Sequence, residues 1–202
     1  MSGAQDLIIR QLTSADIANV RALHHAHRSN ASQDTLLPIK YPTSFFLQLT
    51  LLRERVCLVA YHPQDPTTPV AFVSAALQQN PRVHGLPKSY SLTDGEDDFS
   101  DPVVSKDAPH IEILTLGVLP AYQQRGVARV LVRRVYDYFS ENTNAPRDDT
   151  VVHTNVATSN TSALSFYERM GLKVASGVIR NLYRAVPHGS KDGYLLVGRI
   201  SS

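Results

Sequence analysis

Residues 112–128 read EILTLGVLPAYQQRGVA, and this stretch decides how the rest of the chain is organised. Its first seven residues form an apolar run of strand length that contains no turn-forming residue before Gly117. Pro120 ends the run. The pattern Gln-x-x-Gly-x-Ala then opens a segment with apolar residues at helical spacing. These residues are Val127, Leu131, Val135, Tyr138 and Phe139.

A strand that turns through small residues into a helix presents unpaired backbone N–H groups and the positive end of the helix dipole. Phosphates commonly bind at such a corner. Gly126 and Ala128 would let a pyrophosphate approach the backbone, and Arg125 and Arg129 would add positive charge. The same residues also fit a plain strand–helix turn whose small residues serve packing. The stretch lacks the Gly-Lys-Ser/Thr of a P-loop and has too few glycines for a dinucleotide site, so another phosphate ligand is expected.

Two motifs in this chain resemble the signatures of a known family. The residues Gln123-x-x-Gly126-x-Ala128 after a Leu-x-Val strand are similar to the acyl-CoA-binding signature of the GNAT N-acetyltransferases. Residues 160–172, NTSALSFYERMGL, are similar to the second signature of that family, Asn-x-x-Ala-x-x-Phe-Tyr-x-x-x-Gly-Phe. The resemblance implies an α/β (α+β) fold of GNAT type over residues 1–202, in which a mixed central sheet carries helices on both faces.

The composition suits a single domain of this kind. The chain has 202 residues, 43% of them hydrophobic, which is enough for one sizeable core. A formal net charge of +2 does not argue for direct binding to nucleic acid or to an anionic membrane. The single Cys57 suits a reducing compartment. No apolar run approaches the ~18 residues of a membrane span, and the N-terminus lacks signal-peptide features, so we expect a cytoplasmic protein.

The pattern of apolar and turn-forming residues predicts alternating strands and helices along the chain. Strands are expected over 7–12, 55–61, 70–77, 112–118, 150–156, 173–186 and 194–200. Helices are expected after a capping box at 13–16, after a cap at Thr43 or Ser44, over 127–139, and between a Ser159 cap and Gly171. Residues 78–108 interrupt the pattern with prolines, glycines and an acidic cluster, and are predicted to be a loop or disordered insertion.

Acetyl-CoA is the cofactor that the family resemblance implies, and it assigns roles to two groups of residues. The backbone around Leu116, Gly117 and Val118 would hold the pantetheine arm and the acetyl group. The pyrophosphate would be held by Gln123, Gln124, Arg125, Gly126, Val127, Ala128 and Arg129. The thiol end would lie beside Asn160, Ala163, Phe166 and Tyr167, with Tyr167 as the candidate general acid. The alternative role for Tyr167 is that of a packed aromatic.

The acceptor amine is indicated by a finer resemblance. Residues 37–41, LPIKY, are similar to the Phe-Pro-Val/Ile-x-Tyr segment of N-terminal acetyltransferases that act on chains retaining their initiator methionine. Residues 181–184, NLYR, are similar to the peptide-clamping segment of that group. The NatE catalytic subunit is the best match and the Golgi-associated NatF type is next. The peptide would contact Leu37, Pro38, Ile39, Tyr41, Leu114, Leu182, Tyr183 and Arg184. The apolar residues before Tyr41 fit a pocket for a methionine side chain, or equally a loop packed on the core.

The catalytic positions of that group differ in this chain. Its tyrosine falls at Glu112 and its histidine at Asn155. Glu112 occupies the place of the general-base glutamate of histone-type GNAT enzymes, and Asn155 could orient a water but cannot act as a base. His153 lies two residues before Asn155 on the same strand face and is a second candidate base. Ordinary structural roles for all three residues remain open.

These features predict acetyl transfer to the α-amine of Met-starting peptides, and two alternatives stand beside it. The first is a GNAT lysine or small-amine acetyltransferase with Glu112 as its base, and the second is a non-catalytic subunit that binds CoA. The NatE resemblance implies nascent N-terminal peptides, a NatA-type auxiliary subunit, a second catalytic subunit and the ribosome as partners. No metal is expected, because no carboxylate or cysteine is spaced to join His24, His25 and His27.

Overall fold

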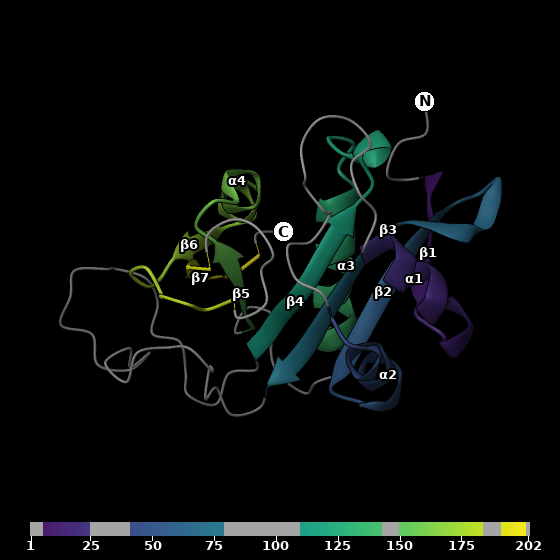
Figure 1. Cartoon of the computed structure of the whole chain (residues 1–202), viewed down its shortest axis with the longest axis horizontal. Coiled ribbons are helices and arrows are strands. Elements are labelled where there is room, and N and C mark those ends of the chain that lie inside the picture. The colour runs from purple at the N-terminus through teal and green to yellow at the C-terminus, as the bar shows by residue number, and fades with distance from the viewer. Residues whose placement is uncertain (1–5, 25–40, 79–109, 143–149, 184–190, 201–202) are drawn as a thin grey trace. The chain divides into compact units, whose positions relative to one another are not determined.

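The structure is a computed structural model that describes residues 6–24, 41–78, 110–142, 150–183 and 191–200. Its described part contains seven strands and four α-helices, shown in Figure 1. The strands are β1 (Ile8–Gln11), β2 (Arg55–His62), β3 (Asp65–Gln78), β4 (His110–Val118), β5 (Val151–Ala157), β6 (Leu172–Val174) and β7 (Gly193–Gly198). The α-helices are α1 (Ile17–His24), α2 (Thr43–Leu51), α3 (Val127–Asn142) and α4 (Thr161–Arg169). Two short 3-10 helices, η2 (Ser14–Asp16) and η3 (Pro120–Tyr122), precede α1 and α3.

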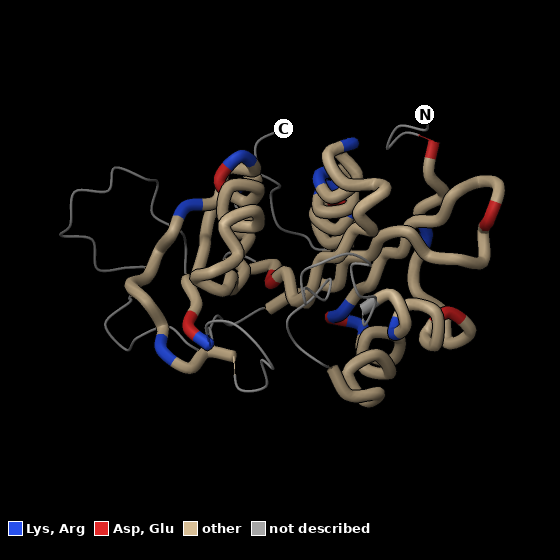
Figure 2. The backbone as a smooth tube through the Cα atoms, turned by 45° about the horizontal axis from the view of Figure 1, so that its top comes forward, with Lys and Arg blue, Asp and Glu red and all other residues tan. Residues whose placement is uncertain are grey.

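The chain divides into two compact units. The first unit consists of Met1–Ala76, Ile113–Tyr138 and Ala185–His188. The second unit consists of Leu77–Glu112, Phe139–Arg184 and Gly189–Ser202. The last residues of β3 and the first residues of β4 therefore belong to the second unit, together with β5, β6, β7 and α4. Acidic and basic residues are spread over the described parts of both units, as Figure 2 shows.

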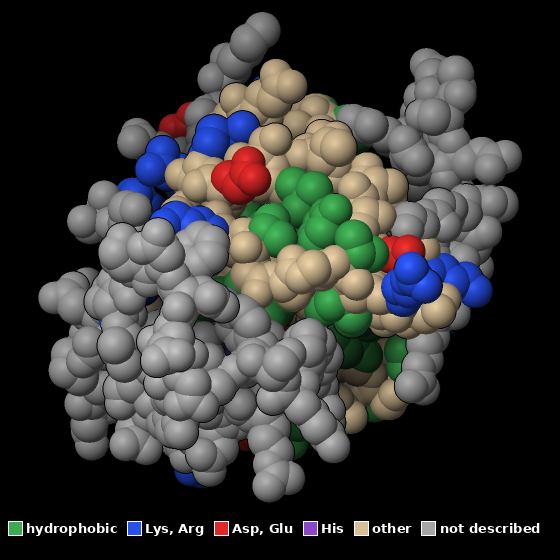
Figure 3. Space-filling view, turned by 90° about the vertical axis from the view of Figure 1, so that its left-hand side faces the viewer, with side chains coloured by type: hydrophobic (Ala, Val, Ile, Leu, Met, Phe, Trp, Pro, Cys, Tyr) green, Lys and Arg blue, Asp and Glu red, His purple; other side chains and the backbone are tan. Residues whose placement is uncertain are grey.

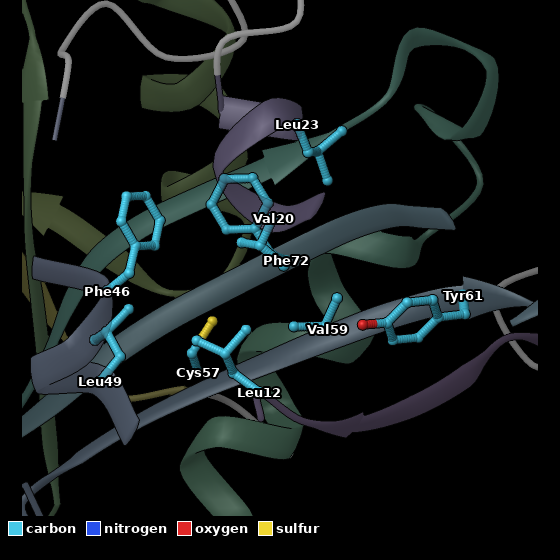
Figure 4. Packing of buried hydrophobic residues seen from close by; sticks show 9 residues of the cluster. All are labelled: Leu12, Val20, Leu23, Phe46, Leu49, Cys57, Val59, Tyr61 and Phe72. Carbon is cyan, nitrogen blue, oxygen red and sulfur yellow. The ribbon is translucent and has the colours of Figure 1, made fainter. Parts of the chain in front are cut away.

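In the first unit, four neighbouring strands run in the order β1-β2-β3-β4. The pairs β1–β2 and β2–β3 are antiparallel. The helices α1 and α2 cover one face of these strands and α3 covers the other (Figure 1), so the prediction of helices on both faces holds in this unit. Side chains from α1, α2, β2 and β3, together with Leu12 after β1, form a hydrophobic cluster between the helices and the first face of the strands, shown in Figure 4. The cluster contains Leu12, Val20, Leu23, Phe46, Leu49, Cys57, Val59, Tyr61 and Phe72.

A buried carboxylate fixes the start of α1 against this cluster. Asp16 is only 6% exposed, and both of its oxygens accept hydrogen bonds from Arg10, at 2.5 and 2.8 Å. The Asp16 carboxylate also accepts from the Thr13 backbone N–H at 3.0 Å and from the Tyr61 hydroxyl at 2.9 Å. The Arg10 guanidinium lies 4.4 Å from the centre of the Tyr61 ring. The capping interaction predicted between residues 13 and 16 is thus part of a larger polar network.

In the second unit, β7 lies between β5 and β6 in the order β5-β7-β6, and both pairs are antiparallel. Gly171, with φ +97°, ends the α4 segment as its position in the sequence predicts. The edge strand β6 has three residues, which leaves little unpaired backbone. Figure 3 shows hydrophobic side chains gathered on one face of the molecule. In this unit Val174 and Val178 are the large hydrophobic residues exposed among those described, at 44% and 51%.

Four sequence-based boundaries differ from the structure. The helix α2 is preceded by Pro42 and its first residue is Thr43, so neither Thr43 nor Ser44 is the N-cap. The strand expected over 70–77 is longer, because β3 begins at Asp65 and accommodates its prolines where the β2–β3 register shifts. The helix α4 is capped by Asn160 and not by Ser159. The strand predicted over 173–186 ends at Val174.

Several expectations fall outside the described residues. They include the insertion, whose residues 79–108 are not described, and the side chains of His24, His25 and His27. Within the described ranges, no helix is long and apolar enough to cross a membrane. No group of three potential metal-ligating side chains occurs among those residues.

Candidate functional site

The corner between β4 and α3, in the first unit, has the backbone geometry of an anion-binding turn. Gln124 and Gly126 adopt left-handed φ values of 59° and 78°, just before α3 begins at Val127. A Cβ on Gly126 would meet no atom within 4 Å, so there is room for a larger side chain at this position. Glycine is favoured because of the left-handed backbone. When left-handed residues alternate with ordinary ones, successive backbone N–H groups point to the same side of the chain. Here they lie next to the unpaired N–H groups at the start of α3.

Side chains hold this corner in place. The Gln123 amide donates a hydrogen bond to the Val118 carbonyl at 3.0 Å, which ties the turn to the end of β4. The Arg125 guanidinium lies 5.7 Å from the centre of the Tyr122 ring, and both Arg125 and Arg129 are exposed. The predicted positive charge is therefore accessible from solvent. Val127 differs, because it is only 3% exposed and packs in the core, which leaves its backbone as the part that can face a phosphate.

The end of β4 is shaped by the core beneath it. A Cβ on Gly117 would lie 2.5 Å from the Phe72 ring, so no larger residue fits unless that ring moves. The hydroxyls of Ser74 and Thr115 are 2.5 Å apart and join β3 to β4 in the interior. Leu116 is half-buried and Val118 is 8% exposed. The segment predicted to hold the pantetheine arm is therefore built on a fixed, tightly packed support.

In the second unit, Glu112 is positioned by a residue that sequence reasoning did not single out. The Gln78 side-chain amide donates to Glu112 Oε2 at 2.6 Å, and both residues are half-buried. Gln78 is the last residue of β3, and Glu112 is the third residue of β4. The bond holds one carboxylate oxygen, and a carboxylate has further acceptor positions. No feature of the sequence indicates this pairing, because it joins two strands on either side of the insertion.

Two histidines form a buried pair in the same unit. His110 and His153 are each 1% exposed, and their ring centres are 6.1 Å apart. Burial lowers the pKa of His110. Burial, and then the neighbouring His110, lower the pKa of His153 to about 4. Both imidazoles are therefore neutral at pH 7. Among the described residues, neither ring nitrogen of His153 has a hydrogen-bond partner.

Asn155 and the residues of α4 are the remaining candidates in the second unit. Asn155 is half-buried on β5 and pairs with Leu195 of β7. The Asn160 side chain accepts from the Ala163 backbone N–H at 3.1 Å, so it caps α4. Tyr167 is 5% exposed and its hydroxyl hydrogen-bonds with Thr154. Burial raises the pKa of Tyr167, so the phenol stays protonated and can donate a hydrogen bond or a proton.

The predicted peptide-clamping segment lies along the start of β7. Asn181 has a left-handed φ of 54°, and its N–H donates to Asp192 Oδ1 at 2.9 Å. The Tyr183 N–H donates to the Lys191 carbonyl at 2.9 Å. Leu182 and Tyr183 are both half-buried. Residues 181–183 therefore have a defined path beside residues 191 and 192, although they do not form the predicted strand.

The remaining substrate-binding candidates divide between core residues and undescribed positions. Tyr41 stacks on Phe45 with ring centres 4.3 Å apart, and Tyr41 and Leu114 both pack against the hydrophobic cluster of the first unit. Leu37, Pro38, Ile39 and Arg184 lie outside the described residues. The cofactor candidates from Leu116 to Arg129 belong to the first unit, and Asn160, Ala163, Phe166 and Tyr167 belong to the second.

Comparison with known proteins identifies the class to which this site belongs. Residues 21–172 match the family model described as Acetyltransferase (GNAT) family. N-alpha-acetyltransferase RimI of Mycobacterium tuberculosis is 37% identical over 73 residues, which are 36% of this chain. The match spans 40% of the length of RimI.

Solved structures share the fold over nearly the whole chain. NAA60 of Arabidopsis thaliana, in complex with a bisubstrate analogue, has a TM-score of 0.69 at 22% identity and covers 96% of this chain and 99% of its own. Naa50 of Arabidopsis thaliana, in complex with the bisubstrate analogue CoA-Ac-MVNAL, has a TM-score of 0.64 at 18% identity, with coverage of 96% and 99%.

The fold and the matched residues define a protein of the GNAT acetyltransferase class. This chain belongs to the GNAT acetyltransferase family. The α/β fold class predicted from its sequence, with a mixed sheet, is confirmed.

Proposed function

We propose that this protein is an N-terminal acetyltransferase that moves acetyl from acetyl-CoA to the α-amine of Met-starting peptides. The second residue of these peptides would be apolar or otherwise not small, and the amine would attack directly in a ternary complex. The observation that carries the proposal is the ordered path of residues 181–183, which bond to Lys191 and Asp192 just before β7, at the position where the family resemblance expects a peptide clamp. The solved Naa50 complex supports it, because the peptide part of its analogue, MVNAL, begins with methionine.

Glu112 is the residue that we assign as the general base. It is half-buried, and the hydrogen bond from Gln78 restrains one of its oxygens. An α-amine with a pKa of about 7.8 is about 14% neutral at pH 7, so its deprotonation costs only about 1 kcal/mol. A lysine amine with a pKa of about 10.4 would cost several kcal/mol. A single carboxylate acting through a water is therefore sufficient for an α-amine substrate.

His153 is a weaker candidate for the same role. Its side chain is 1% exposed, so a substrate amine or a water that bridges to it has little access to the imidazole, and burial lowers its pKa to about 4. Asn155, two residues along β5 and half-buried, would orient the water between the amine and Glu112. Tyr167 would donate a hydrogen bond to the leaving sulfur, because its phenol keeps its proton over the physiological pH range.

The corner of the first unit would hold the phosphates of acetyl-CoA, which supplies the activated acetyl group. The backbone from Gln123 to Ala128 offers N–H donors, and Arg125 and Arg129 offer exposed positive charge. Leu116, Gly117 and Val118 would face the pantetheine arm. Partners are proposed by resemblance alone: nascent N-terminal peptides, a NatA-type auxiliary subunit with its catalytic subunit, and the ribosome, all in the cytoplasm.

The experiment that tests this function is acetyl transfer by the purified chain to a panel of peptides. The panel contains a Met-Leu peptide, a Ser-starting peptide, and a lysine peptide whose N-terminus is blocked. We expect the Met-Leu peptide to have the highest kcat/KM. Faster turnover of the blocked lysine peptide would favour the lysine or small-amine alternative. Binding of acetyl-CoA without turnover of any peptide would favour the non-catalytic alternative.

The variant Glu112→Gln tests the assigned base. If Glu112 only deprotonates the α-amine, kcat/KM should fall about sevenfold at pH 7, because the neutral fraction is then set by the amine alone. The loss should shrink toward pH 9, where the amine is already neutral. A loss that stays constant across this pH range would contradict the assignment of Glu112 as a base.

A further inference from the structure

The connection after β6 is attached to β7 by backbone contacts along its whole described length. The contacts run from residues 175–183 to residues 191–195, and four of them are backbone–backbone hydrogen bonds. They join Ala175 N–H to the Leu195 carbonyl at 2.8 Å, Ile179 and Gly193 reciprocally at 2.8 and 3.0 Å, and Tyr183 N–H to the Lys191 carbonyl at 2.9 Å. Two of the bonded positions, Gly193 and Leu195, belong to β7, and the bond from Tyr183 goes to Lys191 just before it, so the connection is anchored on both sides of residue 182.

Gly193 is the point where side chains from this connection come closest to the sheet. A Cβ on Gly193 would lie 2.6 Å from Leu182 Cδ2 and 3.1 Å from Tyr183 Cε2. It would also lie 3.0 Å from the backbone carbonyl oxygen of Val156, in the neighbouring strand β5. The space above Gly193 is therefore filled by the two side chains predicted to contact the peptide.

We propose that Gly193 is a positioning residue that sets how closely Leu182 and Tyr183 approach the sheet, and thereby sets the affinity for the peptide. This inference rests on the proposed function, in which Leu182 and Tyr183 contact the peptide. Gly193 pairs with Ala157, so it lies two residue pairs from Asn155 along the same two strands. A displacement of Leu182 or Tyr183 at this point would alter the peptide-binding wall, whereas the proposed CoA-binding corner is built from residues of the first unit.

The contacts at Gly193 also predict which atoms would move if a methyl group were added. The carbonyl of Val156 belongs to a strand that is paired with β7 and cannot shift freely. The Leu182 contact is with a terminal methyl group, which can turn away at small cost. The adaptation should therefore be made by Leu182 and its neighbour Tyr183, while the sheet stays in place. Gly193 has no left-handed φ, so alanine does not strain its backbone.

The test compares Gly193→Ala with Gly177→Ala. Gly177 lies in the same connection, but a Cβ there would meet no atom within 4 Å, and its φ is not left-handed. We expect Gly193→Ala to raise the KM for a Met-Leu peptide about tenfold, in line with the usual cost of adding one methylene to a packed site. The kcat and the KM for acetyl-CoA should stay within about twofold of the wild type. Gly177→Ala should match the wild type in all three values.

A second pair of variants keeps the inference testable if Gly193→Ala folds poorly. Leu182→Ala removes the closest contact, so Gly193→Ala should have little further effect on peptide KM in that background. Additive effects of the two substitutions would overturn the inference, as would an unchanged peptide KM in Gly193→Ala. Equal increases in the KM for peptide and for acetyl-CoA would also overturn it. If the wild type acetylates no peptide in the same assay, the proposed function fails and this inference fails with it.

Discussion

The buried pair of His110 and His153 should make the stability of the protein depend on pH in a defined direction. The pKa of His153 falls from 6.5 to about 4 because burial removes water from its charged form and because His110 lies beside it. The unfolded chain therefore binds a proton at a higher pH than the folded chain does. The contribution of His153 to the free energy of unfolding should be constant above pH 6.5, decrease between pH 6.5 and about 4, and level off below.

The size of this effect follows from the same values. A pKa difference of one corresponds to about 1.4 kcal/mol, so a fall from 6.5 to about 4 makes about 3 kcal/mol of stability depend on pH. The pKa of His110 is lowered as well and acts in the same direction. Domains of this kind are usually stable by only about 5–15 kcal/mol, so the loss should be easy to detect.

Urea unfolding at pH 7, 5.5 and 4 measures this loss. We expect His153→Leu to remove much of the decrease between pH 6.5 and 4, because an apolar residue neither titrates nor leaves a buried polar atom unpaired. His62→Gln is the control, since it removes an imidazole of the first unit and keeps the buried pair. An NMR titration should place the His153 imidazole near pH 4. Parallel loss of stability in wild type and His153→Leu, or titration near pH 6.5, would refute the reasoning.

Two further substitutions test the support of the first unit. Asp16→Asn should lower the free energy of unfolding by about 1.5–3 kcal/mol at pH 7, because it removes the charge that accepts the hydrogen bonds from Arg10, Thr13 and Tyr61. Asp65→Asn, at the exposed start of β3, should have a small effect in the same urea titration. Arg10 lowers the pKa of Asp16, so this advantage of the wild type should disappear as the pH falls toward that lowered value, and a constant difference down to pH 2 would contradict it. Gly117→Ala should destabilise by about 1–3 kcal/mol through its contact with the Phe72 ring, and Phe72→Leu in the same background should recover part of the loss in thermal unfolding; no recovery would show that the contact is not the cause.

The parts of the fold that depend on local sequence could be predicted. The apolar run before Gly117 and the helical spacing after Gly126 correspond to β4 and α3, because both patterns are set by neighbours within a few residues. The N-cap of α4 was misassigned by one residue, since Ser159 and Asn160 are both good caps and only the backbone decides between them. The strand expected after Leu172 was too long, because residues 175–183 bond to β7 through bends and an isolated bridge that periodicity does not reveal.

The parts of the site that depend on strand pairing could not be predicted, and they change the assignment of its residues. The sequence offers Glu112 and His153 as two candidate bases and contains nothing that decides between them. Their surroundings in the fold separate them. Glu112 is half-buried, so a water can reach its carboxylate, and Gln78 holds one of its oxygens in place. His153 is 1% exposed, so a substrate amine or a water has little access to its imidazole. A base must exchange its proton with the amine in each turnover, so we assign the role to the accessible carboxylate.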